Sequence, residues 1–223
     1  MVISDTIRPD RRRERTRAAL LDAGEALFAA KGRDGVTIDE ITAAADVAKG
    51  SFYNHFPDRD ALAHEVYRLV RLAVESQVDA ANAGVADPAV RMARAGCVYV
   101  AFAITAPRRA GALIRLFDGE AMADSPLNRG VVGDLEAGFA VGRFGRMSPP
   151  AALLMIYGVA LAGMSRALDA TQPPLDVATV GDLYAGLLRG LGAPSDEAVR
   201  IAAAAARELV EPAVKTARQR SAP

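Results

Sequence analysis

Apolar residues along this chain recur three and four positions apart, and no segment alternates apolar and polar residues over the length of a strand. A spacing of three and four is that of an amphipathic helix, whereas strict alternation would indicate a half-buried strand. We therefore expect an all-α protein. Helices are predicted over residues 11–31, 38–45, 49–56, 59–83, 88–106, 107–122, 127–145, 149–170, 176–191 and 195–211.

Capping signals mark the ends of the early helices. Thr37 has the hydroxyl of an N-cap, and Glu40 follows it at the spacing of a capping box. Pro57 ends the third helix, because the residue before a proline avoids the helical conformation. Asp58 is then placed to cap the fourth helix.

Two short helices, 38–45 and 49–56, follow a longer one and are separated by about three residues, which is the arrangement of a helix-turn-helix. On a wheel of about 100° per residue, Phe52 and Phe56 share a face that must be buried. The other side carries Gly50, Ser51, Tyr53 and Asn54, with His55 at its edge.

That exposed set suits a DNA duplex. Small or amide-bearing side chains approach base edges closely, whereas hydroxyl, imidazole and cationic groups suit phosphate oxygens. Residues of the first kind are Gly50, Ser51 and Asn54, and those of the second are Lys49, Tyr53, His55 and Arg59. The alternative for Tyr53 and His55 is a buried pair that backbone carbonyls satisfy.

The segment GVTIDEITAAADVAKGSFYNHFPDRDAL, residues 35–62, resembles the DNA-binding region of tetracycline-repressor-type (TetR family) regulators. The resemblance covers roughly residues 12–65. Asp46 stands where the family favours glycine, and we expect the turn to survive, because Asp tolerates the left-handed conformation better than most residues. Phe52 replaces the commoner leucine and Arg59 the commoner lysine.

The resemblance implies a role for each matching residue and a domain order. Major-groove contacts would come from Lys49, Gly50, Ser51 and Asn54, and phosphate contacts from Thr37, Tyr53, His55 and Arg59. A helix-turn-helix domain over residues 1–58 would precede a helical ligand-binding and dimerisation domain over 59–212. The basic tail, 213–223, is expected to be disordered.

The expected function is a transcriptional regulator, a repressor first of all, that binds double-stranded DNA as a homodimer and is released by a small, largely apolar effector. Dimerisation is predicted on the helices near 149–170 and 176–191, through Leu153, Gly158, Leu161, Leu183 and Leu187. The effector pocket is predicted from aromatic and methionine side chains and one cation: Tyr99, Phe102, Arg115, Phe117, Met122, Phe139, Phe144, Met155 and Tyr157. The same side chains would also suit a filled core, and an activator without small-molecule induction stays open.

Charge supports a DNA role only locally, because the 27 Lys and Arg residues balance the 27 Asp and Glu residues. Residues 8–17, RPDRRRERTR, hold six arginines against Asp10 and Glu14. Such a run is ordinarily a solvated terminus, and it gains meaning only when a DNA-binding unit follows it.

Other chemistry is not predicted. Cys97 is the only cysteine, which fits a cytoplasmic protein, and its apolar surroundings predict an inert thiol. Two histidines without ligand spacing predict no metal site, and no cofactor is expected. No glycine-rich phosphate loop or nucleophile elbow follows a strand, so no enzyme is predicted. A helical interaction module without a DNA role remains an alternative.

One segment is long and apolar enough for a membrane helix, since residues 147–165 carry no charge. Two prolines open it, however, and glycine, alanine and serine dilute its hydrophobicity. We expect a helix inside a soluble bundle and no membrane partner.

Overall fold

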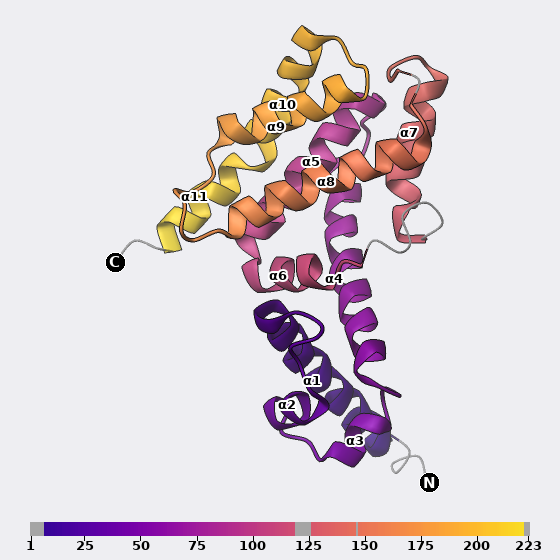
Figure 1. The fold of residues 1–223 in the computed structure, drawn as a ribbon, viewed down its shortest axis with the longest axis vertical. Helices are drawn as coiled ribbons and strands as arrows, with labels where there is room; N and C mark the ends of the chain where they lie inside the picture. The colour runs from indigo at the N-terminus through magenta and orange to yellow at the C-terminus, as the bar shows by residue number, and fades with distance from the viewer. Residues whose placement is uncertain (1–6, 119–125, 146, 221–223) are drawn as a thin grey trace. The chain divides into compact units, whose positions relative to one another are not determined.

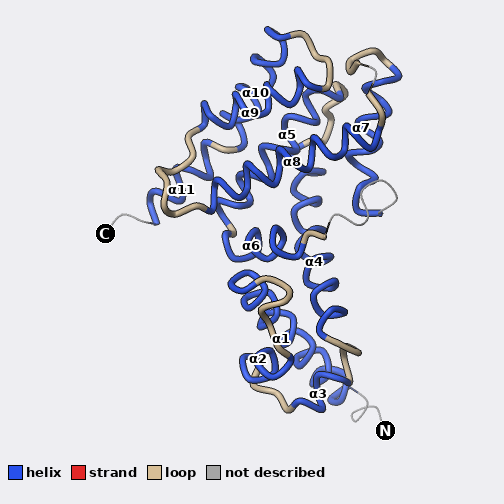
Figure 2. Tube along the Cα trace, in the orientation of Figure 1, coloured by secondary structure: helices blue, strands red, loops and turns tan. Residues whose placement is uncertain are grey.

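The computed structural model describes residues 7–118, 126–145 and 147–220, and within these ranges the side chains of residues 11–219. Throughout this part of the chain the regular structure is helical, as predicted, with no strand (Figures 1 and 2). The α-helices are α1 (Ile7–Lys31), α2 (Ile38–Ala44), α3 (Lys49–Tyr53), α4 (Arg59–Ala81), α5 (Pro88–Thr105), α6 (Pro107–Leu116), α7 (Arg129–Ala140), α8 (Pro149–Leu168), α9 (Val177–Gly190), α10 (Ser195–Leu209) and α11 (Glu211–Arg220). A short 3-10 helix, η1 (Pro126–Asn128), precedes α7.

Three predicted helices are clearly too long. Helix α6 ends at Leu116, whereas the prediction continued to residue 122. Helix α3 stops at Tyr53, because the chain closes into a turn in which the Phe52 carbonyl accepts from the amides of both His55 and Phe56. Helix α7 stops at Ala140, and Gly142 then adopts a φ of 68°, a left-handed conformation that favours glycine.

The prediction of a disordered tail is wrong over most of its length. Helix α11 runs to Arg220, and Pro212 lies in its first turn. N–H groups in the first turn have no helical acceptor, so a proline there costs no hydrogen bond. Ala213 and Val214 are buried, and α11 packs on α5 and α10. Burial of this apolar face stabilises a segment whose composition is otherwise polar.

The chain divides into two compact units. Unit 1 comprises residues 1–70 and 108–117, and unit 2 comprises residues 71–107 and 118–223. Unit 1 therefore extends past the boundary expected at residue 58, because the first half of α4 buries Leu62 and Val66. Leu62 lies against Gly24 of α1, where an added Cβ would be 3.0 Å from the leucine side chain.

Helix α6 also belongs to unit 1, since it packs on α1. Arg108 donates to Asp22 and Glu25 over 2.7 and 3.0 Å, and Gly111 faces Ala29. The DNA-binding head expected from the sequence is thus larger than a three-helix motif.

Unit 2 is built around α5, which contacts α7, α8, α9, α10 and α11. Tyr184 of α9 is fully buried against Gly96 of α5, where a Cβ would lie 2.0 Å from the ring. Cys97 is buried beside it, and burial raises the pKa of its thiol to about 12, so the thiol is unreactive at neutral pH.

Helix α8 is long and apolar enough to cross a membrane by length and composition, and a third of its most apolar window is buried inside unit 2. One side of α8, with Leu153, Ile156 and Tyr157, packs into that core. The opposite side exposes small and apolar residues, among them Leu154 at 64% exposure.

Candidate functional sites

The helix-turn-helix geometry of α2 and α3 follows from local chemistry. Thr37 caps α2 in a complete capping box: its hydroxyl accepts from the Glu40 amide, and the Glu40 carboxylate accepts from the Thr37 amide. The turn between the helices places Asp46 at a φ of 53°, which confirms the expected left-handed conformation. Phe52 and Phe56 are buried with ring centroids 5.9 Å apart, and they anchor α3 to the core.

The anchored helix leaves its other side open. Tyr53 is 52% exposed, and its ring meets the Phe52 ring edge to face. Asn54 is exposed as well, and nothing lies within 4 Å of a Cβ built on Gly50. Residues 50–56 therefore have the predicted buried aromatic side and accessible polar side, although the helix itself ends at Tyr53.

Lys49 forms an exposed ion pair with Asp39 of α2, with Nζ 2.7 Å from Oδ1. The hydrogen bond to Asp39 raises the pKa of Lys49, which keeps the ammonium charged. Exposed pairs of this kind contribute little stability, so Lys49 can exchange Asp39 for another anion at small cost.

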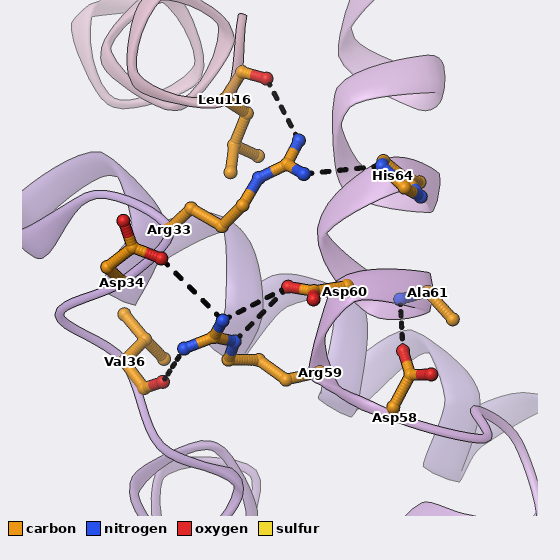
Figure 3. Close-up of polar contacts among 9 residues, drawn as sticks. All are labelled: Arg33, Asp34, Val36, Asp58, Arg59, Asp60, Ala61, His64 and Leu116. Carbon is orange, nitrogen blue, oxygen red and sulfur yellow. Dashed lines mark hydrogen bonds and ion pairs between the residues drawn. The ribbon is translucent and has the colours of Figure 1, made fainter. Parts of the chain in front are cut away.

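Arg59 is already engaged in unit 1 (Figure 3). Its guanidinium donates to the Val36 carbonyl over 3.3 Å and to Asp60 over 3.2 Å, and it lies 3.7 Å from Asp34. Asp58 caps α4 through the Ala61 amide, as the sequence predicts. Arg59 therefore holds the turn before α2 to the start of α4, in addition to any contact it makes with a phosphate.

A cationic recess lies between α1 and the end of α3. It has a volume of about 280 Å³ and is lined by Arg13, Glu14, Arg17 and His55. Burial, followed by the charges of Arg13 and Arg17, lowers the pKa of His55. The sequence indicated a basic run here but did not single out Arg13 and Arg17, whose spacing of four directs both toward His55.

Comparison with known proteins agrees with this geometry. The profile of bacterial regulatory proteins of the tetR family matches residues 20–66. The transcriptional repressor DhaR of Mycobacterium sp. (strain GP1) is 44% identical over 50 residues, 22% of this chain and 25% of DhaR. The TetC protein of transposon Tn10 from Escherichia coli is 33% identical over 63 residues, 28% of this chain and 32% of TetC. The N-terminal part of this chain is therefore a helix-turn-helix domain of the tetR type.

These two tetR-type relatives match only a quarter to a third of their own length, so they bear on the DNA-binding head. One solved structure extends the likeness. RolR in complex with resorcinol has a TM-score of 0.62 and 29% identity to this chain, covering 86% of this chain and 95% of RolR.

The residues predicted for the effector pocket lie on several elements, most of them in unit 2. Tyr99 and Tyr157 share a site, whereas Phe139 and Phe144 form a separate pair 6.2 Å apart. Phe102 is buried in α5, and Met155 lies against Gly190. Arg115 and Phe117 belong to unit 1, and Met122 lies outside the described residues.

The site around the two tyrosines is polar, and sequence reasoning missed its centre. Arg71 is 5% exposed and lies over both rings, 5.3 Å from the Tyr99 centroid and 5.4 Å from that of Tyr157. It pairs with Glu75 over 2.9 Å and donates to Asn128 over 3.3 Å. The sequence held one sign of this site, because Arg71 is a charged residue next to the buried Val70 and near the buried Val74 of α4.

The tyrosine hydroxyls complete this polar cluster, which we define as Arg71, Glu75, Tyr99, Asn128 and Tyr157. Tyr99 donates to Glu75 and Tyr157 donates to Asn128, each over 2.5 Å. Burial raises the pKa of Tyr99 well above its usual range, so this phenol stays protonated and acts as a donor.

The predicted dimer residues separate into two groups. Leu153 and Leu187 are 1% and 3% exposed and pack inside unit 2, so they present no surface to a partner. Gly158 is exposed, and Leu161 and Leu183 are half-buried. Leu154, which the sequence prediction did not include, is the leucine that α8 exposes most.

Proposed function

We propose that this protein is a transcriptional repressor that binds a palindromic operator as a homodimer and is released by a small effector bound in unit 2. The observation that carries the DNA-binding part is the segment 50–56. Phe52 and Phe56 are buried there, whereas Gly50, Tyr53 and Asn54 are exposed to solvent. The family match over residues 20–66 supports the same role.

On this proposal the residues of this surface divide by task, with Ser51 and His55 half-buried and Lys49, Gly50, Tyr53 and Asn54 exposed. Gly50, Ser51 and Asn54 approach base edges, where an amide pairs well with adenine. Tyr53 and His55 contact phosphates, and Lys49 exchanges Asp39 for a phosphate or a base edge. The recess of Arg13, Arg17 and His55 is a further place for a phosphate oxygen.

Dimerisation is proposed on the solvent side of α8 with α9. Ala151, Leu154, Gly158, Leu161 and Ser165 recur along α8 at alternating spacings of three and four, which is the period of a helix-packing seam. Gly158 has no neighbour within 4 Å of an added Cβ, so a second helix can approach closely there. We call this set the α8 stripe.

The effector is proposed to be a small aromatic molecule. RolR, which is 29% identical over most of both chains, binds resorcinol in its crystal structure. Unit 2 of the present chain places Tyr99, Tyr157 and Arg71 together, which provides aromatic faces and donors for such a ligand.

Release requires that the effector bind the non-DNA-binding conformation more tightly than the binding one. Helix α4 runs from Arg59 in unit 1 to Ala81 in unit 2, so it links the two functions covalently. Two half-sites must be met about one DNA turn apart, roughly 34–36 Å, and a shift of a few ångströms would break several phosphate contacts.

Fluorescence anisotropy with the duplex upstream of the protein's own gene tests the DNA role. We expect saturable binding. The logarithm of the association constant should fall linearly with the logarithm of the salt concentration. Tyr53→Ala and Lys49→Ala should weaken it, whereas Lys215→Ala on α11 is the control lysine. Binding that ignores salt, or that survives Tyr53→Ala unchanged, would contradict the proposal.

A further inference from the structure

Stability does not explain the polar cluster in unit 2. The Arg71 side chain is 6% exposed and Asn128 is 6% exposed, so a charge and an amide have both lost water. Desolvation of a buried ion pair offsets most of the attraction between its partners, and apolar residues of similar volume are often as stable. A cluster drawn from α4, α5, η1 and α8 therefore calls for a functional account.

The hydrogen bonds of the cluster leave one acceptor open. Tyr99 donates to Oε1 of Glu75 over 2.5 Å, and Nη2 of Arg71 forms an ion pair with the same oxygen at 2.9 Å. Within the described residues, the other oxygen, Oε2, accepts no hydrogen bond. The Glu75 side chain is 21% exposed, so a small molecule can reach it.

The surroundings of that oxygen are aromatic and electrically balanced. The Tyr99 and Tyr157 rings flank Arg71 on the same side of α4 as Glu75. The guanidinium of Arg71 and the carboxylate of Glu75 offset one another, so the pair offers no net positive charge to an anion. A neutral donor of hydrogen bonds with a flat apolar body fits these features, and a carboxylate ligand would be repelled by Glu75.

We propose that the polar cluster recognises a neutral hydroxylated aromatic, with Oε2 of Glu75 accepting a phenolic hydroxyl of the ligand beside the rings of Tyr99 and Tyr157. This inference rests on the proposed effector-binding role of unit 2 and specifies its chemistry. The chain displays the same chemistry internally, since the Tyr99 phenol already donates to Oε1 of the same carboxylate.

Isothermal titration calorimetry with a ligand series tests this without altering the protein. The probes are resorcinol, 3-methoxyphenol, 1,3-dimethoxybenzene, m-xylene and 3-hydroxybenzoate. We expect resorcinol and 3-methoxyphenol to bind at least about ten-fold more tightly than the two compounds without a hydroxyl, because a partly buried carboxylate distinguishes a donor from its methyl ether by about that factor. The benzoate should bind more weakly than resorcinol, since its charge faces Glu75.

A matched pair of variants assigns the effect to Glu75. Glu75→Gln keeps the shape but removes the charge, so the ratio of affinities for 3-methoxyphenol and 1,3-dimethoxybenzene should fall to within about three-fold. Tyr184→Phe is the control, because it removes a buried phenol whose hydroxyl has no hydrogen-bond partner among the described residues. Its ratio should match that of the unaltered protein.

The outcomes separate the two proposals. If dimethoxybenzene or m-xylene binds within about three-fold of resorcinol, if none of the series binds, or if folded Glu75→Gln keeps the ratio, the inference about the polar cluster is wrong. Salt-dependent DNA binding would then still stand. If Glu75→Gln loses its helical circular dichroism, the ligand series alone decides.

Discussion

Arg33 donates a hydrogen bond from Nη2 to the main-chain carbonyl of Leu116 over 3.3 Å, while its Nη1 lies 3.3 Å from Nε2 of His64 (Figure 3). Leu116 is the last residue of α6, where helical carbonyls have no partner of their own. A cation at that end satisfies a carbonyl and complements the helix dipole. Together with Arg108, this contact makes α6 a part of unit 1.

The docking of α6 on α1 should be measurable at Glu25. Its carboxylate accepts from Arg108 over 3.0 Å and lies 3.4 Å from Arg109. Glu25→Gln should increase amide hydrogen exchange across residues 107–116 by about two- to five-fold, the factor expected from losing an ion pair of at most about 1 kcal/mol. Glu14→Gln, the same change elsewhere on α1, is the control. Unaltered exchange in Glu25→Gln would show that packing at Gly111 holds α6 by itself.

Base reading and phosphate binding should separate on α3. Tyr53→Phe removes one exposed hydroxyl and should weaken binding to all DNA sequences about equally, by roughly 1–3 kcal/mol at most. Asn54→Ala should change which base is preferred at one position of each half-site by a similar amount. Anisotropy against a panel of single-base operator variants measures both. If Asn54→Ala weakened binding to all operator variants equally, Asn54 would be a phosphate contact and not a base contact.

The α8 stripe should control the oligomeric state. Leu154→Glu puts a charge on a side chain that is 64% exposed in the protomer, so it should yield monomers in sedimentation velocity with helicity retained. Val141→Glu is the control, since Val141 is 67% exposed and lies outside the stripe. Leu187→Glu is a different experiment: Leu187 is 3% exposed, and a buried charge there should unfold unit 2. Dimers of Leu154→Glu would place the interface elsewhere.

Acid should weaken unit 1 through Glu65. Its carboxylate accepts from Arg68 over 2.7 Å and from Arg17 of α1 over 2.5 Å, and these contacts lower its pKa from 4.5 to about 2. Between those values the unfolded chain binds the proton that the folded chain does not, so this stabilisation is complete above pH 4.5 and is lost as the pH falls toward 2. Thermal melts of Glu65→Gln should therefore depend less on pH between 5 and 3, whereas Glu136→Gln should follow the unaltered protein. Parallel acid curves for both variants would contradict this role for Glu65.

The close contact between Gly96 and the Tyr184 ring predicts opposite effects of two small substitutions on the stability of unit 2. Gly96→Ala would place a methyl group 2.0 Å from the Tyr184 ring, and it should destabilise unit 2 by roughly 1–3 kcal/mol in urea unfolding. Tyr184→Phe removes a buried hydroxyl without a partner in the described structure, and it should leave stability unchanged or raise it. Destabilisation by Tyr184→Phe would indicate an ordered water on that hydroxyl.

The sequence by itself determined the elements whose chemistry is local. The Thr37–Glu40 cap, the left-handed turn at Asp46 and the buried Phe52–Phe56 pair depend on residues at most four apart. Spacing along one helix or turn therefore predicts them. The family resemblance, which rests on the same local residues, is confirmed by the tetR-family match over residues 20–66.

Only the tertiary structure decided which polar groups meet across elements. Arg71 contacts residues 56 and more positions away in the chain. Its spacing of four from Glu75 would by itself indicate only an ion pair on the solvent side of a helix. The aromatic residues predicted for the effector pocket come from different helices, and helix packing decides which of them meet, as it does for Tyr99 and Tyr157 at Arg71. Local sequence pattern does not contain that packing. Helix α11 was missed for the same reason: its two buried residues, Ala213 and Val214, are stabilised by α5 and α10. Burial depends on the whole fold, whereas a cap or a turn depends on its neighbours in the chain.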